Sequence, residues 1–441
     1  MTLSGKIRRL GFHIRDYLIN KKEDSVCYQW KNIEKILSDY NQGWAETEKN
    51  LQNILDYATE NSDFYKSYKN KPFNAFPVVN KIILTDNFEK IRVKKYSKKD
   101  LHIMRTSGST GTPFEIVQDM VKRNRVLAEL KYFGNIAGYK THEKMLFFRA
   151  HYSGSFWKQF WSNVWQPESS NLSHKNVIKM FEYQQNSQAI LSYASTLHLL
   201  AKDYLDNKEE YDKLHITTDT VKAIFSGSEL LSEDTRQLCK KVWKNAEVYS
   251  RYSNMENGIL GQEDFSDNKK VFKLNWASYY FEVLKMDSDE PANYGEMGRI
   301  VITDFFNKAF PMIRYDTGDL GIMEKDENAF PYMIEISGRK MNILYATNGD
   351  LISPNCLGRL MHNLTENIKQ WQFIQTGEKE YCIKCSCEDR ENGIASMNKK
   401  IDSLKETFGQ DAKINIIFVD EIPVLNSGKR KHVVQEWKQY H

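Results

Sequence analysis

Apolar residues recur at the spacing of an α-helix in the N-terminal part of the chain. Trp30, Ile33 and Ile36 follow one another at intervals of three, and Leu51 and Leu55 repeat the helical spacing further on. A helix with apolar residues at these intervals buries one face and leaves the other in water. The pattern therefore predicts helices over residues 28–66.

Short apolar runs alternate with helical patterns in the middle of the chain. Residues 101–117 have the pattern of a strand, a loop of small residues and a second strand, and a long helix is expected over 120–138. Residues 145–150 are apolar and predict a buried strand. A strand, a turn and a helix follow over 222–243, where Ser232 suits the helix N-cap. Strands that alternate with helices favour an α/β sheet that is largely parallel.

The pattern changes twice more towards the C-terminus. Residues 270–336 are rich in alternating strand-like runs separated by turns. After Gly338 the pattern is that of a smaller α+β unit, with a hairpin over 373–387 and a helix over 395–408. We therefore predict two domains, a large one over residues 1–338 and a small one over residues 339–441.

The first residues predict a basic amphipathic helix. Within residues 5–22, Ile7, Leu10, Ile14 and Leu18 share one face, and most of the basic side chains lie elsewhere. We expect this helix to dock on the body of the protein. Weak contact with the surface of an anionic membrane is the alternative.

The composition narrows the class of protein. Of the 441 residues, 41% are hydrophobic and 27% are charged, which excludes a disordered or collagen-like chain. The formal net charge of +4 is small for this length and argues against nucleic acid as a partner. No apolar run approaches the ~18 residues of a membrane-spanning helix, and the N-terminus lacks the apolar core of a secretory signal.

Six cysteines are present, three of them in the run Cys382, Cys385 and Cys387. A single run of this kind without a second cluster or a nearby histidine is weak evidence for a metal site, so free cysteines on a strand are expected. Sparse cysteine and the absence of a signal favour a reducing cytoplasm.

The loop after the first predicted strand carries the most distinctive chemistry. It consists of Thr and Ser hydroxyls and Gly backbone amides with little side-chain bulk, which can surround the oxygens of a polyphosphate. No Gly-Lys-Ser/Thr follows, so the loop is not a P-loop. A flexible surface loop is the alternative. Its residues are Thr106, Ser107, Gly108, Ser109, Thr110 and Gly111.

Three further segments can contact a nucleotide. Asp319 on a glycine turn could accept two hydrogen bonds from a ribose diol, although such turns are common in hairpins. Glu256, four residues after Tyr252, could hold Mg²⁺ against phosphates. Lys429 on a Ser-Gly-Lys turn could be a mobile phosphate-binding cation or part of a solvated basic tip.

The order and spacing of these motifs resemble the adenylate-forming superfamily of acyl-CoA synthetases, adenylation domains and luciferases. The similarity is greatest to the branch of phenylacetate–CoA ligases and CapK-like capsular polysaccharide proteins, and covers roughly residues 28–435. It includes the upstream segments LDYATENSDFYKSY and FPVVNK. The resemblance implies an α/β fold, with a large N-terminal adenylate-forming domain of mixed sheets and helices and a small mobile α+β C-terminal domain.

The resemblance also implies a role for each motif. The Ser/Thr/Gly loop would hold the ATP phosphates, Ser228 and Glu229 would line the adenine pocket, and Tyr252 would stack on adenine. Asp319 would bind the ribose, Arg339 the ribose or a phosphate, Glu256 would bind Mg²⁺, and Lys429 would bridge the substrate carboxylate and the α-phosphate. The weaker candidates for the acid pocket are Phe148, Arg149, His151 and Tyr193.

Two positions depart from the family pattern. Met255 replaces the usual Thr before the glutamate, and Met341 and Asn342 replace the acidic pair that often follows the Gly-Arg. The second departure affects the expected hinge of the small domain. Both departures leave in place the residues on which adenylate formation depends most.

The implied activity is that of an ATP-dependent, Mg²⁺-dependent carboxylate ligase. It forms an acyl-adenylate and passes the acyl group to a thiol, either CoA or a carrier protein, or to an amine. One alternative is an amide-forming ligase that attaches an acid to a sugar or amine in polysaccharide or antibiotic biosynthesis. A second alternative is a relative that binds a nucleotide without turnover.

Overall fold

The computed structural model divides the chain into two compact units. One comprises residues 1–144, 156–164 and 249–336, and the other comprises residues 145–155, 165–248 and 337–441. The chain enters the second unit for the last time at Ser337, close to the predicted boundary at Arg339, which stays a prediction. The structure describes residues 2–106, 114–148, 155–167, 172–265, 270–327, 330–339, 344–352, 357, 360–361, 368–423 and 432–437.

The first unit contains the helices that the N-terminal periodicity predicts. Short 3₁₀ turns connect them at Lys22–Asp24, Lys66–Tyr68, Phe73–Ala75 and Lys98–Asp100. The helices are α1 (Leu3–Ile19), α2 (Val26–Ser38), α3 (Tyr40–Asn61), α4 (Lys81–Asp86), α5 (Phe88–Ile91), α6 (Met120–Ile136) and α7 (Phe156–Ser162).

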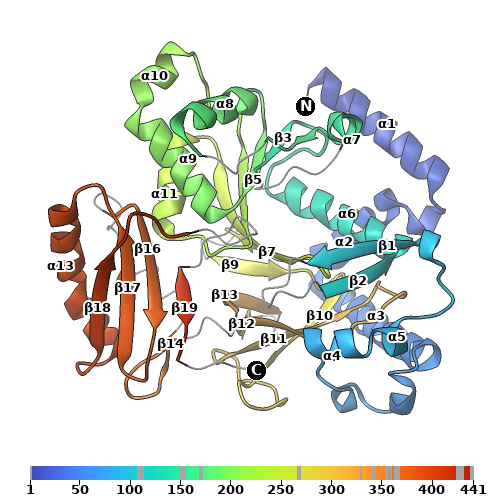
Figure 1. Cartoon of the computed structure of the whole chain (residues 1–441). Helices are drawn as coiled ribbons and strands as arrows, with labels where there is room; N and C mark the ends of the chain where they lie inside the picture. Colours follow the sequence, from blue (N-terminus) through green and yellow to red (C-terminus); the bar gives the residue numbers. More distant parts are fainter. Residues whose placement is uncertain are drawn as a thin grey trace. The chain divides into compact units, whose positions relative to one another are not determined.

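Most strands of this unit belong to one sheet, in the order β10-β11-β12-β13-β9-β8-β7 (Figure 1). The pairings β10–β11, β11–β12, β13–β9, β9–β8 and β8–β7 are antiparallel. The strands are β1 (Leu101–Thr106), β2 (Phe114–Asp119), β7 (Glu247–Asn254), β8 (Gly258–Asp264), β9 (Val271–Leu274), β10 (Tyr279–Leu284), β11 (Met297–Asp304), β12 (Tyr315–Lys325) and β13 (Pro331–Arg339).

A single large core joins this sheet to the N-terminal helices. Leu55 and Ala58 on α3 and Leu84 on α4 pack with strand residues such as Ile300 and Tyr315. The strands β1 and β2 form a separate antiparallel hairpin. The expected strand, loop and strand over 101–117 is thereby confirmed for the two strands.

The second unit contains the parallel strands. β5 pairs in parallel with β3 on one side and with β6 on the other, and helices connect these strands. The expectation of a largely parallel sheet is therefore correct for these strands and wrong for β1–β2 and β7–β8. The elements are β3 (Met145–Phe147), β4 (Val164–Trp165), α8 (His174–Gln184), β5 (Ala189–Ser192), α9 (Ala194–Asp206), α10 (Lys208–Lys213), β6 (Ala223–Gly227) and α11 (Glu233–Val242).

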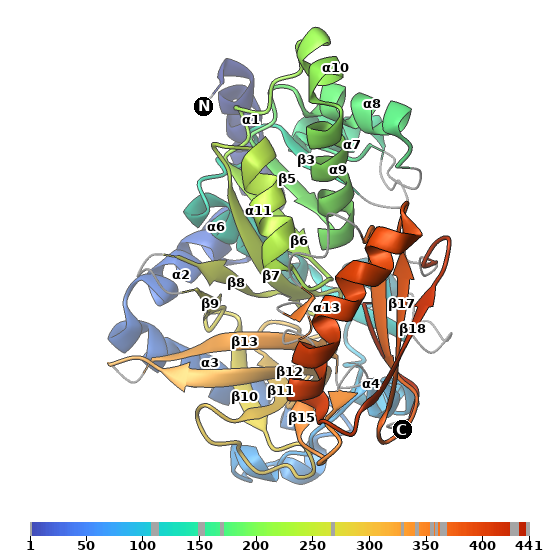
Figure 2. The ribbon, with the colours of Figure 1, turned by 90° about the vertical axis from the view of Figure 1, so that its left-hand side faces the viewer.

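The C-terminal elements form an α+β arrangement, as predicted. A four-stranded sheet has the order β18-β17-β16-β19, and α13 covers one face of it (Figure 2). The predicted hairpin is β16 and β17. The elements are β14 (Leu344–Tyr345), β15 (Leu351–Ile352), β16 (Gln370–Gln375), β17 (Glu380–Ser386), α13 (Arg390–Phe408), β18 (Lys413–Phe418) and β19 (Val433–Gln435).

The cysteine run lies on and just after β17. Cys382 and Cys385 are buried, Cys387 is half-buried, and all three are free cysteines. Within the described ranges there is no group of three or more His, Cys, Asp or Glu side chains that could hold a metal ion. The expected strand position is confirmed for Cys382 and Cys385, which lie on β17.

Candidate active site

A tight turn at the start of β12 presents Asp319. Gly318 adopts a positive φ of 76°, a conformation that costs glycine little and other residues more. Asp316 accepts a hydrogen bond from the Gly318 amide at 2.9 Å and pairs with the Arg299 guanidinium at 2.7 Å. The Thr317 hydroxyl accepts from the Asp319 amide at 3.2 Å. These bonds hold the carboxylate of Asp319 in place.

Tyr252 of β7 contacts this carboxylate directly. Its hydroxyl donates to Oδ2 of Asp319 at 3.0 Å and lies 3.2 Å from Oγ1 of Thr317. Burial raises the pKa of Tyr252 well above its ordinary value, and the charge of Asp319 raises this pKa further. The hydroxyl therefore stays protonated at neutral pH and remains a donor. Two residues that the sequence assigns to the nucleotide are thus neighbours in the fold.

Glu256, the predicted metal ligand, is buried and paired. Its side chain is 3% exposed, and Nζ of Lys81 lies 2.5 Å from Oε1. The hydroxyl of Tyr315 donates to the same oxygen at 3.3 Å. Burial raises the pKa of Tyr315 well above its ordinary value, followed by the charge of Glu256, so this donor also keeps its proton. Lys81 is a residue to which the sequence analysis gave no role.

Backbone pairing explains why Lys81 reaches Glu256. The Val79 amide donates to the Arg314 carbonyl at 3.0 Å, and the Asp316 amide donates to the Val79 carbonyl at 2.8 Å. The next residue, Asn80, caps α4 by accepting from the Ile83 amide. Lys81 is therefore the first residue of a helix whose start is fixed against β12. A lysine after this Pro-Val-Val-Asn segment was the signal available in the sequence.

The hairpin β1–β2 brings both ends of the Ser/Thr/Gly loop into the first unit. Thr106 ends β1 and pairs with Phe114, which begins β2. Gln118 of β2 donates to the backbone carbonyl of Glu256 at 3.0 Å. The loop residues 107–113 and the side chain of Thr106 lie outside the described part, so their assignment to phosphate stays a prediction.

A buried charged network supports the turn that carries Glu256. Nζ of Lys122, on α6, lies 2.7 Å from Oδ2 of Asp304, and both side chains are fully buried. The Asn257 amide Nδ2 contacts the same carboxylate at 3.3 Å. The Tyr279 hydroxyl donates to the Asn257 carbonyl at 2.7 Å. Breaking a paired buried charge of this kind is costly, so the network holds the β7–β8 turn firmly.

Other predicted residues lie in the second unit. Ser228 follows β6 with a positive φ of 66°, and Glu229 accepts from the Ser195 amide at 2.8 Å. Ser195 lies on α9, and Tyr193 is the N-cap residue of that helix. Phe148 is buried in the core between the strands and helices of this unit. The roles assigned to these residues stay predictions.

Several assigned side chains lie outside the described residues. Arg339 ends β13, and only its backbone is described. Nothing is described for the remaining ones, which are Arg149, His151, Met341, Asn342 and Lys429. Met255 is described and 47% exposed.

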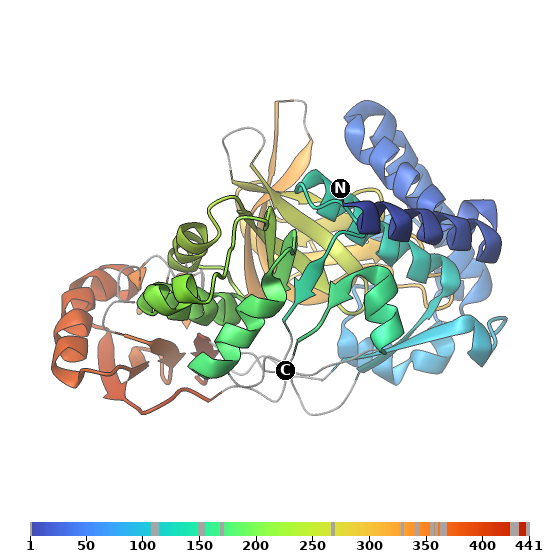
Figure 3. The ribbon, with the colours of Figure 1, turned by 90° about the horizontal axis from the view of Figure 1, so that it is seen from above.

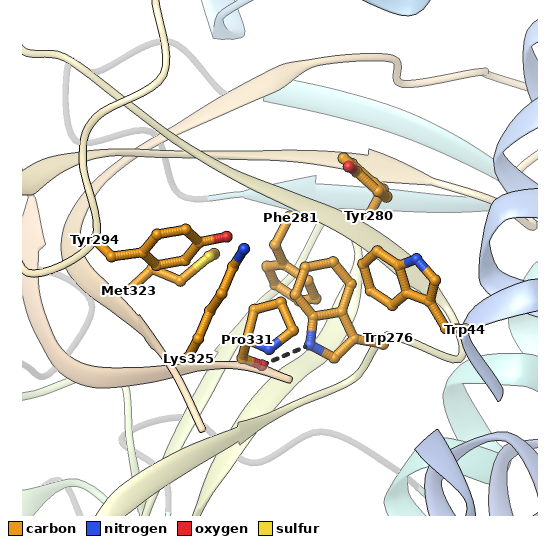
Figure 4. Close-up of a pocket in the computed structure, with 8 residues that line it drawn as sticks. All are labelled: Trp44, Trp276, Tyr280, Phe281, Tyr294, Met323, Lys325 and Pro331. Carbon is orange, nitrogen blue, oxygen red and sulfur yellow. Dashed lines mark hydrogen bonds between the residues drawn. The ribbon is translucent and has the colours of Figure 1, made fainter. Parts of the chain in front are cut away.

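An aromatic pocket of about 280 Å³ lies elsewhere in the first unit (Figure 4). Trp276 donates from Nε1 to the Pro331 carbonyl at 3.1 Å, and the Lys325 ammonium lies 4.4 Å from the ring centroid of Tyr294. None of the described residues that are assigned to the nucleotide lines this pocket. Its lining residues are Trp44, Trp276, Tyr280, Phe281, Tyr294, Met323, Lys325 and Pro331.

The groups around Glu256 favour the binding of Mg²⁺ in one respect and oppose it in another. Mg²⁺ is commonly bound by one or two carboxylates together with substrate phosphates, so a single buried glutamate is sufficient on the protein side. The ammonium of Lys81 already neutralises this carboxylate. Lys81 and Tyr315 both contact Oε1, so Oε2 is the oxygen at which a metal ion would meet least competition.

Comparison with known proteins identifies the C-terminal part of the chain. Residues 344–436 match the family described as the CapK C-terminal domain. Over 95% of its length, the chain is 23% identical to Protein CapK of Staphylococcus aureus, of which the match covers 94%.

CoA ligases are among the solved structures with a similar fold. A 2-hydroxyisobutyryl-CoA ligase in its postadenylation state has a TM-score of 0.71 at 16% identity, and the match covers 90% of each chain. The anthranilate–CoA ligase AuaEII in complex with anthranoyl-AMP has a TM-score of 0.57 at 15% identity, covering 77% of this chain and 66% of that one. ATP-bound MatB from Rhodopseudomonas palustris has a TM-score of 0.54 at 15% identity, covering 77% and 68%. The expected fold of the adenylate-forming ligases is confirmed.

Proposed function

We propose that this chain, which has the fold of the adenylate-forming ligases and a CapK-like C-terminal domain, activates a carboxylic acid with ATP. The observation that carries the proposal is the contact between Tyr252 and Asp319 on a rigid turn. A fixed carboxylate beside a buried aromatic ring suits a nucleoside, because the ring offers a stacking face and the carboxylate accepts from ribose hydroxyls.

In the first half-reaction a carboxylate oxygen of the substrate attacks the α-phosphorus of ATP, and the bond to pyrophosphate breaks. Negative charge grows on the α-phosphate and on the leaving group. Lys429 and the hydroxyls and amides of the loop 106–111 would stabilise this charge electrostatically. Mg²⁺ bound at Glu256 would supply further positive charge at the phosphates.

In the second half-reaction an acceptor attacks the acyl carbon of the adenylate, and AMP leaves. We propose a thiol, with CoA as the first candidate, because the similar structures are named as CoA ligases. The alternative is an amine or sugar acceptor in polysaccharide biosynthesis, which the resemblance to the CapK-like capsular polysaccharide proteins implies. A carrier-protein thiol is chemically equivalent to CoA.

The competing proposal is a protein that binds a nucleotide but does not catalyse a reaction. Among the described residues, Met255 favours this proposal. Its side chain cannot offer the phosphate-side hydroxyl of the usual threonine. Against this stand the placement of Glu256, Tyr252 and Asp319 in one unit, the hydrogen bond from Tyr252 to Asp319 and the contact of Tyr315 with Glu256. We therefore favour the enzyme. We propose the cytoplasm as its location, because free cysteines fit a reducing compartment and the proposed reaction requires ATP.

The experiment is an analysis of products with a panel of carboxylic acids. The purified chain is incubated with ATP, Mg²⁺ and each acid, first alone and then with CoA or with amines. Acid-dependent AMP and pyrophosphate support a ligase, and the thioester or amide product identifies the acceptor. ADP and phosphate as products, or ATP binding without turnover across the panel, would contradict the proposal.

A further inference from the structure

The N-terminal helix α1 docks on the first unit through its polar face. Asp16 is buried and accepts from the amides of Val26 and Cys27 at 2.9 and 2.8 Å, which caps the start of α2. The Thr2 hydroxyl lies 3.0 Å from a carboxylate oxygen of Glu143. Gly5 faces the same carboxylate, so closely that a side chain at this position would clash with it. These contacts fix the helix and determine which side faces the protein.

The helix therefore docks on the protein, as expected from the sequence, but its apolar face points away from the protein. At 3.6 residues per turn, the apolar positions gather opposite Gly5 and Asp16. The side chains at these apolar positions are between 52% and 80% exposed. The ribbon of α1 runs along the outer edge of its unit (Figure 3). The residues of this apolar face are Leu3, Ile7, Leu10, Ile14, Tyr17 and Leu18.

The short helix α7 extends this apolar surface. Nε of Arg8 donates to the Phe160 carbonyl at 2.8 Å, and its guanidinium lies 4.7 Å from the Phe160 ring centroid. The two helices lie side by side in Figure 1. On α7, Phe156, Trp157 and Trp161 are 56%, 66% and 54% exposed. The exposed apolar residues of α1 and α7 together are called the α1–α7 face below.

The exposed charges on these two helices are all positive. Lys6 and Arg15 on α1 and Lys158 on α7 are exposed. The single acidic residue of α1 is the buried Asp16, and α7 contains none. The apolar surface thus carries tryptophans and basic groups, which is the combination that favours the boundary of an anionic bilayer.

We propose that the α1–α7 face binds the surface of an anionic membrane, with α1 lying in the plane of the interface. Its apolar side chains would enter the acyl boundary, and Lys6, Arg15 and Lys158 would meet acidic headgroups. A second copy of the chain fits the surface less well, because a symmetric contact would bring the positive charges of both copies together. Among the described helices, none is long and apolar enough to cross a membrane, so this is surface binding.

The test is co-sedimentation of the full chain with vesicles, at 0.1 and about 0.5 M salt. One set of vesicles is phosphatidylcholine alone and the other contains roughly a third phosphatidylserine. The proposal predicts binding to the anionic vesicles that is at least about tenfold stronger and that falls with salt. Equal binding to both kinds of vesicle, or none to the anionic ones, would overturn it.

Matched variants locate the contact on the α1–α7 face. The double variant Leu10→Ser/Ile14→Ser should weaken vesicle binding by roughly tenfold or more, because two apolar side chains no longer enter the bilayer. Lys6→Gln/Arg15→Gln should weaken it by about fivefold per charge. Ile82→Ser is the control, since Ile82 is 63% exposed on α4.

All of these side chains are exposed, so the variants should keep the wild-type melting temperature. Wild-type vesicle binding by the Leu10→Ser/Ile14→Ser variant would contradict the proposal. So would a dimer of the wild-type chain in analytical ultracentrifugation that this variant dissolves, because the face would then belong to a second copy. The readouts do not depend on ligase activity, so the two proposals fail separately.

Discussion

Asp319 combines a negative charge with a backbone that cannot easily move. The Asp316–Gly318 hydrogen bond, the Asp316–Arg299 ion pair and the Thr317–Asp319 bond define the turn, and the Tyr252 hydroxyl orients one carboxylate oxygen. A group held in this way loses little conformational freedom when a ligand binds.

Asp319→Ala should weaken ATP binding by at least roughly 10- to 100-fold, because a single charge-assisted hydrogen bond to a diol contributes about 1.5–3 kcal/mol. Tyr252→Phe should lose less, since it removes only the orienting hydroxyl. Isothermal titration calorimetry with ATP measures both. Unchanged affinity in a folded Asp319→Ala variant would show that the ribose does not bind there.

The ion pair of Lys81 and Glu256 gives a second prediction at this scale. Without the ammonium, the weak contact with Tyr315 is the one that the buried carboxylate keeps among the described side chains, and an unpaired buried charge is destabilising. Because the side chain of Lys81 is 38% exposed, solvent reduces the effect. Lys81→Gln should lower the melting temperature by roughly 2–5 °C in EDTA, and added Mg²⁺ should restore part of this loss.

Thermal unfolding with and without Mg²⁺ measures this directly. Lys69→Gln is the matched control, because Lys69 pairs with Glu60 at 3.7 Å and both side chains are more than half exposed. It should show neither the loss nor the recovery. If Mg²⁺ stabilises wild type, Lys81→Gln and Lys69→Gln equally, then Glu256 is not the metal ligand.

At the scale of elements, the periodicity of the sequence predicted helices and strands well. It could not predict which strands pair, because antiparallel pairs such as β7–β8 and parallel ones such as β5–β6 have similar apolar runs. For the same reason the sequence did not reveal the pairing of Val79 with β12, which places Lys81 beside Glu256, although the segment Pro-Val-Val-Asn-Lys itself was recognisable. The periodicity of α1 identified its apolar face, but the docking side depends on Asp16 and Gly5.

A histidine between α9 and α11 makes the stability of the fold depend on pH. His198 on α9 lies with Nδ1 3.1 Å from the Thr235 hydroxyl oxygen on α11. Burial lowers the pKa of His198 to about 4, and the charge of Lys202 adds to this. As pH falls from about 6.5, the unfolded chain takes up this proton before the folded one does. His198 therefore stabilises the fold above about pH 6.5, and this contribution is lost as pH falls towards 4.

Melting temperatures between pH 7.5 and 4.5 test this, with His198→Asn compared with wild type. The variant should show a shallower loss of stability on acidification. His174 provides a contrast of opposite sign: the carboxylates of Glu210 and Asp203 raise its pKa, so its contribution is present at low pH and is lost as pH rises through that raised pKa. An unchanged slope in His198→Asn would refute the assignment.

At the scale of the whole molecule, the assigned residues are divided between the two units. Tyr252, Glu256 and Asp319 are described in the first, whereas Ser228 and Glu229 are described in the second. The motifs were recognisable in the sequence because their order along the chain resembles one superfamily. The arrangement of loops rich in Gly, Ser and Thr could not be predicted, because such loops have no apolar periodicity.

The measurement that tests the account most directly is the rate of each half-reaction in Lys429→Ala, with Arg430→Ala as the control. A lysine ammonium between two anions contributes most where charge grows on the α-phosphate. Formation of the acyl-adenylate should therefore fall by about two to four orders of magnitude. Transfer from a synthetic acyl-adenylate should continue near the wild-type rate, and Arg430→Ala should change neither step. Wild-type adenylate formation in Lys429→Ala, or an equal loss in both steps, would contradict the account.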